Sequence, residues 1–145
     1  MRITVANHQQ TVRFDLRWLK KLASGALKQV KLLLPLRSDA PLPILEVIEV
    51  SIVSDEVIAE IHERFMQVGG ATDVITFEHG EILISADTAK SNATRYGETL
   101  DRELARYVVH GLLHLNGHED GSRTEAARMR GAQEKILRQC CAAIS

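Results

Sequence analysis

Apolar residues recur along this chain with two different spacings, and the spacing changes from segment to segment. Short apolar runs, alternating with polar residues most clearly over 46–53, predict strands at 3–6, 46–53, 74–77 and 81–84. Helical spacing predicts helices over 15–31, 54–66 and 100–116, a short helix ahead of Gly97, and a last helix after Ser122. The expected fold is α+β, with a small mixed β-sheet of about four strands and helices packed against it. We expect residues 1–145 to form a single domain.

The ends of these elements are marked by residues that cap helices or turn the chain. Asp15 and Ser54 are typical N-cap residues, and Ser122 forms a capping box with Glu125. Glu78-His79-Gly80 separates two short strands and predicts a hairpin. Gly69-Gly70 predicts a further break between elements, and a loop contains Pro35, Pro41 and Pro43. The apolar stripe of the first helix consists of Leu16, Leu19, Ala23, Leu27 and Val30.

The composition is that of an ordinary globular domain, with 45% hydrophobic and 26% charged residues. The chain contains no apolar run of about 18 residues, and it opens in a strand-like pattern rather than a signal peptide. We therefore expect no membrane span and a cytoplasmic location. Cys140 and Cys141 are adjacent and lie outside any C-x-x-C pattern, so both are expected to be reduced, one packed and one at the surface.

A net charge of −1 argues against a general polyanion binder, but the first helix has a local concentration of positive charge. Its basic residues fall within an arc of about 100° opposite the apolar stripe. They are Arg17, Lys20, Lys21, Lys28 and Lys31. Such a face is most often the solvated side of an amphipathic helix, and the alternative is a surface that contacts RNA phosphates.

The most informative segment runs from His110 to Asp120. His110 and His114 are four residues apart, so on a helix both imidazoles project from one face and can reach one metal ion at about 2 Å. Gly117 can take the left-handed conformation that ends a helix and turns the chain back. Asp120 is then placed to return as a third ligand. We predict one Zn²⁺ per chain, held by His110, His114 and Asp120, with one coordination position open.

The third ligand has two alternatives, His118 and Glu119. Asp120 is preferred because it lies three residues past the turn glycine, the offset used by the long zinc motif of metzincins. The protease form of this motif has Glu directly after the first histidine, and that Glu acts as general base. Here the position is Gly111, which is either tolerated in the helix or allows close approach of another group. Ordinary metalloproteolysis is therefore disfavoured.

The segment His110-Gly-x-Leu-His114-Leu-x-Gly resembles the signature of the YbeY family of bacterial metal-dependent endoribonucleases, which are associated with rRNA maturation. Two further segments are similar to family motifs in the same order: Thr72-Asp73-Val74-Ile75-Thr76-Phe77 and Gly80-Glu81-Ile82-Leu83-Ile84-Ser85. The resemblance covers roughly residues 46–140. It implies the same α+β fold.

Two positions depart from the family pattern. The third metal ligand of the family is usually His, whereas the matching residue here is Asp120, and His118 falls where an aromatic residue is common. The arginine that the family places ahead of the first strand motif, and that is linked to RNase activity, corresponds to Met66. Arg64 is close to that position, and His62 occupies the position of a family Asn. Asp73 or Glu81 is expected to orient a ligand histidine.

The resemblance implies a single-strand-specific, zinc-dependent endoribonuclease acting late in rRNA maturation, at the 3′ end of 16S rRNA. Its partners would be RNA and the ribosome or its small subunit. No catalytic residue is assigned, and Met66 implies weak activity. One alternative is an RNA- or ribosome-associated binding factor with a structural metal. Another is a metal-dependent hydrolase of a different bond, for which Glu119 is the only nearby base.

Overall fold

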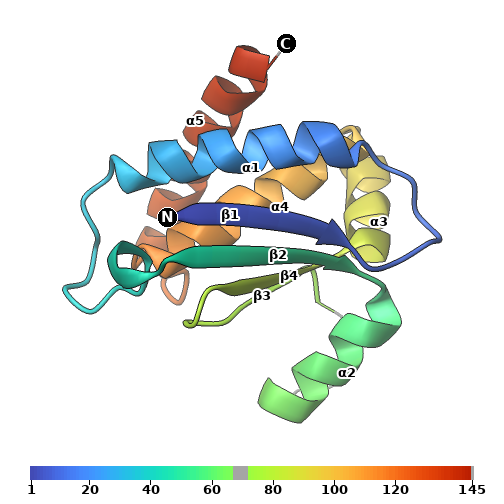
Figure 1. Ribbon diagram of the computed structural model, residues 1–145, viewed down its shortest axis with the longest axis horizontal. Helices are drawn as coiled ribbons and strands as arrows, with labels where there is room; N and C mark the ends of the chain where they lie inside the picture. Colours follow the sequence, from blue (N-terminus) through green and yellow to red (C-terminus); the bar gives the residue numbers. More distant parts are fainter. Residues whose placement is uncertain (67–71, 145) are drawn as a thin grey trace.

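The computed structural model describes residues 1–66 and 72–144, and at residue 66 the backbone alone. Gly69 and Gly70 lie outside the described residues. A four-stranded sheet has the order β1-β2-β4-β3, with bounds Arg2–Asn7, Val47–Val53, Glu81–Ser85 and Val74–Thr76 (Figure 1). β1, β2 and β4 are parallel, and β3 runs antiparallel to β4 as the predicted hairpin. The predicted mixed sheet is therefore confirmed.

The helices predicted over 15–31, 54–66 and 100–116 begin and end within one residue of those positions, and the helices expected ahead of Gly97 and after Ser122 are also present. Their bounds are Leu16–Lys31 (α1), Asp55–Met66 (α2), Ala86–Tyr96 (α3), Leu100–Leu115 (α4) and Arg123–Ile144 (α5), with a 3₁₀ turn at Leu42–Ile44 (η1). The predicted caps are present, because Asp15 Oδ1 accepts from Trp18 N at 3.0 Å and Ser122 Oγ accepts from Glu125 N at 3.1 Å. Ser54 Oγ accepts from Val57 N at 3.3 Å in the same way.

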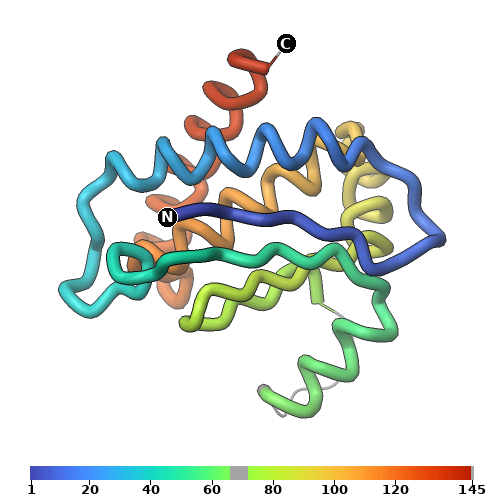
Figure 2. Tube along the Cα trace, in the orientation of Figure 1, coloured from blue at the N-terminus to red at the C-terminus, as the bar shows by residue number. Residues whose placement is uncertain are grey.

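Different helices pack on the two faces of the sheet. Alternate residues of β2 and β4, including Ile52 and Ile82, belong to the main core together with α1, α4 and α5. Leu83 and Ile75 point to the other face, where they pack with Ile58 of α2 in a smaller cluster. Figure 1 and the trace in Figure 2 accordingly show α2 on the opposite side of the sheet from α1 and α4.

Helix α4 is the centre of the molecule, because it contacts α1, α3, α5, β3 and β4. Its closest approach to the sheet is at Gly111, where a Cβ atom would lie 2.8 Å from Ile82 Cδ1 and 3.0 Å from Ile82 Cγ2. Of the two roles expected for Gly111, close approach is the one the structure confirms. A larger side chain there would push α4 away from β4.

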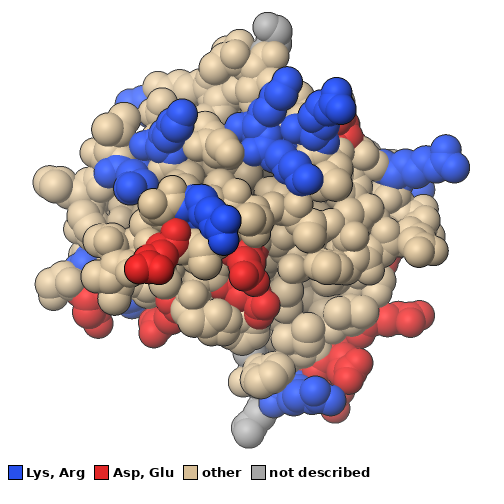
Figure 3. Space-filling model, viewed as in Figure 1, with Lys and Arg blue, Asp and Glu red and all other residues tan. Residues whose placement is uncertain are grey.

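The surface features predicted from sequence are also present. All five basic residues of α1 are exposed, and Figure 3 shows Lys and Arg gathered over α1 with acidic groups mostly below them. Cys140 is buried and Cys141 partly buried, and neither forms a disulfide bond. Among the described residues, no helix combines the length and apolar character needed to cross a membrane.

Candidate metal centre

The chain reverses direction directly after α4 through a turn that only glycine fits. Gly117 has φ +95°, its N–H donates to His114 O at 3.0 Å, and His118 N donates to Leu113 O at 3.0 Å. These two hydrogen bonds form a Schellman motif, which ends a helix in a left-handed residue. A Cβ at Gly117 would also lie 2.9 Å from Arg37 N, because the loop after α1 packs on this turn. The turn sends the following residues back along α4.

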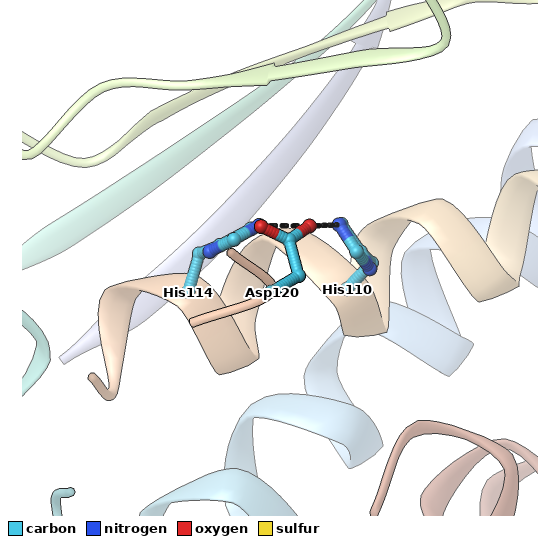
Figure 4. A group of neighbouring side chains, drawn as sticks. All are labelled: His110, His114 and Asp120. Atoms are coloured by element: carbon cyan, nitrogen blue, oxygen red, sulfur yellow. Dashed lines mark ion pairs between the residues drawn. The ribbon is translucent and has the colours of Figure 1, made fainter. Parts of the chain in front are cut away.

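The return of the chain brings Asp120 to the two histidines, as the spacing predicted. Asp120 Oδ2 lies 3.8 Å from His110 Nε2 and 3.6 Å from His114 Nε2 (Figure 4). One ligand atom from each of the three residues lies within 4.8 Å of the others. The two imidazoles are half-buried and nearly perpendicular, with ring centroids 4.7 Å apart. Two imidazole nitrogens and a carboxylate oxygen are a donor set that zinc accepts.

Each histidine is held in the orientation that aims its Nε2 atom at Asp120. His110 Nδ1 lies 2.8 Å from Gln133 Oε1, and His114 Nδ1 lies 3.0 Å from the carbonyl oxygen of His118. Both partners are acceptors, so each Nδ1 carries the hydrogen and donates it. The lone pair of each ring is therefore on Nε2, the atom that faces the centre of the group.

The electrostatic environment favours neutral imidazole, the form that binds a metal. Burial lowers the pKa of His114 below its usual value, and the neighbouring His110 lowers it further. The opposing influence of Asp120 is smaller. A ligand that is neutral over a wider pH range competes less with protons for the metal.

The alternative third ligands point elsewhere. His118 is buried, with 5% of its surface exposed, and lines a separate hollow with Arg128 and Glu125. Burial is also the main cause that lowers the pKa of His118. Glu119 Oε1 accepts from Arg37 Nη1 at 2.7 Å, which turns that carboxylate toward the loop after α1. Neither residue belongs to the described group of convergent ligand atoms.

Gln133 is the residue that sequence reasoning missed. The expectation that Asp73 or Glu81 orients a ligand histidine is wrong, because Gln133 and a backbone carbonyl occupy the two Nδ1 positions. Asp73 Oδ1 instead accepts from Val74 N at 2.8 Å. A signal was available, because Gln133 is a buried polar residue in an otherwise apolar stripe of α5. The stripe contains Met129, Ile136, Leu137 and Cys140.

Two hollows open on either side of the three ligand residues. The first, which we call the β3 hollow, has a volume of about 350 Å³ and is lined by His110, His114, Val74, Thr76, Arg37 and Glu119 among others. The second, the α5 hollow, has about 360 Å³. It includes His110, Asp120, Gln133, Arg106, Arg130 and Tyr96 in its lining. Because His110 lines both, the candidate metal position lies between them.

The basic face of α1 is remote from this site. Asn116 marks the side of α4 that packs on α1, since its Nδ2 atom donates to Val30 O of α1 at 3.5 Å. Figure 4 shows His110 and His114 on the side of α4 away from α1. The lysines of α1 lie on its solvent face, so α1 itself separates them from α4.

Other residues considered from sequence fall outside the group of ligands. Arg64 of α2 pairs with Glu60 at 3.2 Å, and Arg102 pairs with Glu98 at 3.3 Å. His62 is half-buried on α2, and His79 is exposed and stacked on Phe77. The side chain of Met66 lies outside the described residues.

The family model described as Endoribonuclease YbeY matches residues 4–141 of this chain. The chain belongs to the YbeY family. The match extends well beyond the residues 46–140 on which the resemblance was noted, and it includes α1 and most of α5.

Curated relatives agree with this assignment. The endoribonuclease YbeY of Myxococcus xanthus is 37% identical over 103 residues, which cover 62% of this chain and 35% of the relative. The Phocaeicola vulgatus protein of the same name is 38% identical over 91 residues, covering 58% and 66%. That of Porphyromonas gingivalis is 40% identical over 90 residues, covering 57% and 60%. The matched part thus spans less than two thirds of each of these relatives.

A solved structure supports the fold. The solution structure of a Thermotoga maritima protein superimposes with a TM-score of 0.67 at 24% sequence identity. The superposition covers 97% of this chain and 90% of the other. The likeness confirms the α+β architecture of the chain.

Proposed function

We propose that residues 1–145 form a metal-dependent hydrolase domain that cleaves single-stranded RNA as an endoribonuclease. The observation that carries the proposal is the convergence of His110, His114 and Asp120 in a chain of the YbeY family. We assign one Zn²⁺ to these three residues, because two histidines and a carboxylate match catalytic zinc sites that keep an open position. The name of the relatives, endoribonuclease, supports RNA as the substrate class.

A divalent ion bound here would supply Lewis acidity to a phosphodiester and lower the pKa of a nearby water. The protein's own contribution is positional. Gln133 and the His118 carbonyl keep both Nε2 atoms turned inward, and the carboxylate of Asp120 would offset part of the charge of a bound ion. The substrate strand would lie along the β3 hollow and the α5 hollow, which share His110 in their linings.

The biological setting follows from the family rather than from the geometry. We propose late rRNA maturation at the 3′ end of 16S rRNA as the role, with the ribosome or its small subunit as the partner, in the cytoplasm. Cys140 and Cys141 are not joined in a disulfide bond, which fits a reducing compartment. On this proposal the basic face of α1, far from the cleavage site, contacts structured RNA beyond the cleaved strand.

Hydrolysis of a peptide or amide bond is less well supported. Gly111 stands where a peptidase has its base, and Ile82 leaves no room for a side chain there. Glu119, the other candidate base, is engaged by Arg37. A binding factor with a structural metal is the stronger alternative, because Met66 replaces the family arginine.

Cleavage of a short end-labelled single-stranded RNA tests the proposal. The protein would be assayed metal-free, after reloading with Zn²⁺, and as the His114→Ala variant exposed to the same Zn²⁺. We expect cleavage by the reloaded protein alone, and little cleavage of a duplex of the same sequence. Equal cleavage by the metal-free protein, or full activity of His114→Ala, would contradict it.

The activity of the natural chain is expected to be weak, because Met66 cannot offer positive charge to the phosphate. Met66→Arg should therefore increase turnover. Metal content should not change, because residue 66 is not among the proposed ligands. If Met66→Arg instead slows an already fast enzyme, another cation of this chain carries out the role of the family arginine.

A further inference from the structure

The arginines at the two hollows differ in how strongly their charges are already neutralised. Cleavage of a phosphodiester builds negative charge on the non-bridging oxygens, and a guanidinium that can donate two hydrogen bonds stabilises that charge. A guanidinium that is already surrounded by carboxylates has fewer free N–H donors and less net positive charge for a substrate phosphate. The contacts of each arginine therefore decide which one is available to a substrate.

Arg37, in the β3 hollow, is already engaged. Its guanidinium lies 2.7 Å from Glu119, 3.3 Å from Asp39 and 3.9 Å from Glu78. These contacts tie the loop after α1 to the turn that presents Asp120. Arg37 thus holds the turn in place, and its charge is offset by three acids.

Arg106, in the α5 hollow, is engaged still more completely. It makes a bidentate pair with Glu134, at 2.9 and 3.0 Å, and also contacts Glu98 and Glu103. The hydrogen bond to Glu134 is the main reason that the pKa of Arg106 is raised. Its donors are directed at protein carboxylates, so it serves to join α4 to α5.

Arg130 is different, because it forms no ion pair with any residue in the parts of the chain that the structure describes. It is exposed and lines the α5 hollow together with His110 and Asp120. It lies three residues before Gln133 on α5, so both project from the same helix face, one turn apart. Gln133 contacts His110 directly, which places Arg130 beside the metal centre.

The α5 hollow also contains an aromatic ring suited to a base. Tyr96, at the end of α3, is 67% exposed and lines the same hollow as Arg130. Arg95 Cζ lies over this ring, 5.5 Å from its centroid, so a base would stack on the other face of the ring. An aromatic ring near an unengaged cation is a combination by which proteins bind single-stranded nucleic acids, with the base stacked and the phosphate paired. The volume of about 360 Å³ is in the range of small-molecule sites.

We propose that the α5 hollow binds the nucleotide next to the cleaved bond, with Arg130 paired to its phosphate and Tyr96 stacked on its base. Arg130 would then supply part of the positive charge that Met66 lacks. This inference rests on the proposed nuclease function for its substrate. It assigns the residual activity of the natural chain to an arginine on α5.

The test compares Arg130→Gln and Arg130→Lys with Arg138→Gln, which removes the same charge from an exposed position of α5. We expect Arg130→Gln to lower kcat about 100-fold, as the loss of one donor to a developing oxyanion does. Metal content and folding should not change. Arg130→Lys should retain part of the activity, since it keeps the charge without the bidentate geometry. Arg138→Gln should behave as the natural protein.

Three further measurements separate a direct role from a structural one. Guanidinium ion at low millimolar concentration should restore turnover to an Arg130→Ala variant. Met66→Arg should recover activity in the Arg130→Gln background if both side chains serve the same phosphate. Tyr96→Ala should raise KM and leave kcat nearly unchanged. Equal losses in Arg130→Gln and Arg138→Gln, or no loss in either, would overturn the proposal.

A binding measurement tests the nucleotide site separately from the proposed nuclease activity. The same single-stranded RNA would be titrated into the metal-free natural protein and the metal-free Arg130→Gln variant, neither of which is expected to cleave it. Weaker binding to Arg130→Gln supports the nucleotide site even if no RNA is cut. Equal binding to the two proteins refutes the site even if the natural protein is an active nuclease.

Discussion

Two neighbouring faces of helix α4 show how one helix of 16 residues meets two different demands. On its packed side α4 contacts α1 and β4, and position 111 has no room for a Cβ atom beside Ile82 of β4. On its open side His110 and His114 are only half-buried and line the hollows. The packed side holds the helix rigid, and rigidity of the helix keeps the two imidazoles aligned. Changes on the two sides should therefore affect different properties, stability on one and metal affinity on the other.

The largest effect is expected from the ligand residues on the open side. His114→Ala should abolish zinc binding, and Asp120→Ala should weaken it strongly, because each removes a donor atom from the group of three. Metal content after dialysis and a competitive chelator titration would measure both. His118→Ala is the matched control and should retain the metal. Loss of metal in His118→Ala together with its retention in Asp120→Ala would show that the turn presents a different ligand.

A smaller loss of metal affinity is expected from the residue that orients His110. Gln133→Ala removes the acceptor 2.8 Å from His110 Nδ1, and such changes cost about 10- to 100-fold in affinity. Gln133→Glu keeps an acceptor at the same place and should bind zinc at least as well. Gln139→Ala, an exposed glutamine on the same helix, is the control. Unchanged affinity in Gln133→Ala would mean that packing alone orients the ring.

On the packed side, a single methyl group at position 111 should cost stability and leave the affinity for zinc almost unchanged. In Gly111→Ala the new Cβ meets three atoms of Ile82 within 3.2 Å, which outweighs the better helix propensity of alanine. We expect a net loss of about 1 kcal/mol in the free energy of unfolding, measured with urea.

Gly131→Ala is the matched control for that experiment. It lies within α5 with nothing within 4 Å of an added Cβ, so it should stabilise the protein by up to about 1 kcal/mol. Ile82→Val should reduce the cost of Gly111→Ala, because the nearest clashing atom, Cδ1, is then absent. If Gly111→Ala gains as much stability as Gly131→Ala, the close approach of α4 to β4 does not restrict the size of the side chain at position 111.

The smallest effect concerns the remote basic face. Reversing Lys21 and Lys28 to Glu should lower affinity for long RNA and reduce the slope of log affinity against log salt by about 1.4 for single strands. Metal content and cleavage of a short oligonucleotide should not change, because α1 lies between these lysines and α4. Unchanged affinity for long RNA would identify this face as ordinary solvated surface.

The sequence predicted local features well because local rules produce them. The order of elements, the caps at Asp15 and Ser122, and the grouping of His110, His114 and Asp120 all depend on spacing within about ten residues. Long-range contacts were not predictable in this way. A polar residue in the apolar stripe of α5 marks Gln133 as unusual, but the sequence does not show that it reaches His110, 23 residues earlier. Nothing in α1 shows which side of α4 it will cover.

The sequence also does not show which charged side chains are neutralised by their neighbours in the fold. Arg106 and Arg130 look alike in the sequence, but only the fold shows that one is surrounded by Glu98, Glu103 and Glu134. Arg64 lies two residues before Met66 in the sequence, but in the fold it pairs with Glu60. Arg102 likewise pairs with Glu98.

Direct observation of the metal is the sharpest test of the site on the open side of α4. Crystals of the zinc-loaded protein, with anomalous data collected at the zinc edge, should show one ion per chain. We expect Nε2 of His110 and of His114 at about 2.0–2.1 Å and a carboxylate oxygen of Asp120 at about 2.0–2.2 Å. An ion coordinated by His118 or Glu119 in place of Asp120, or no anomalous peak between the two histidines, would contradict the account.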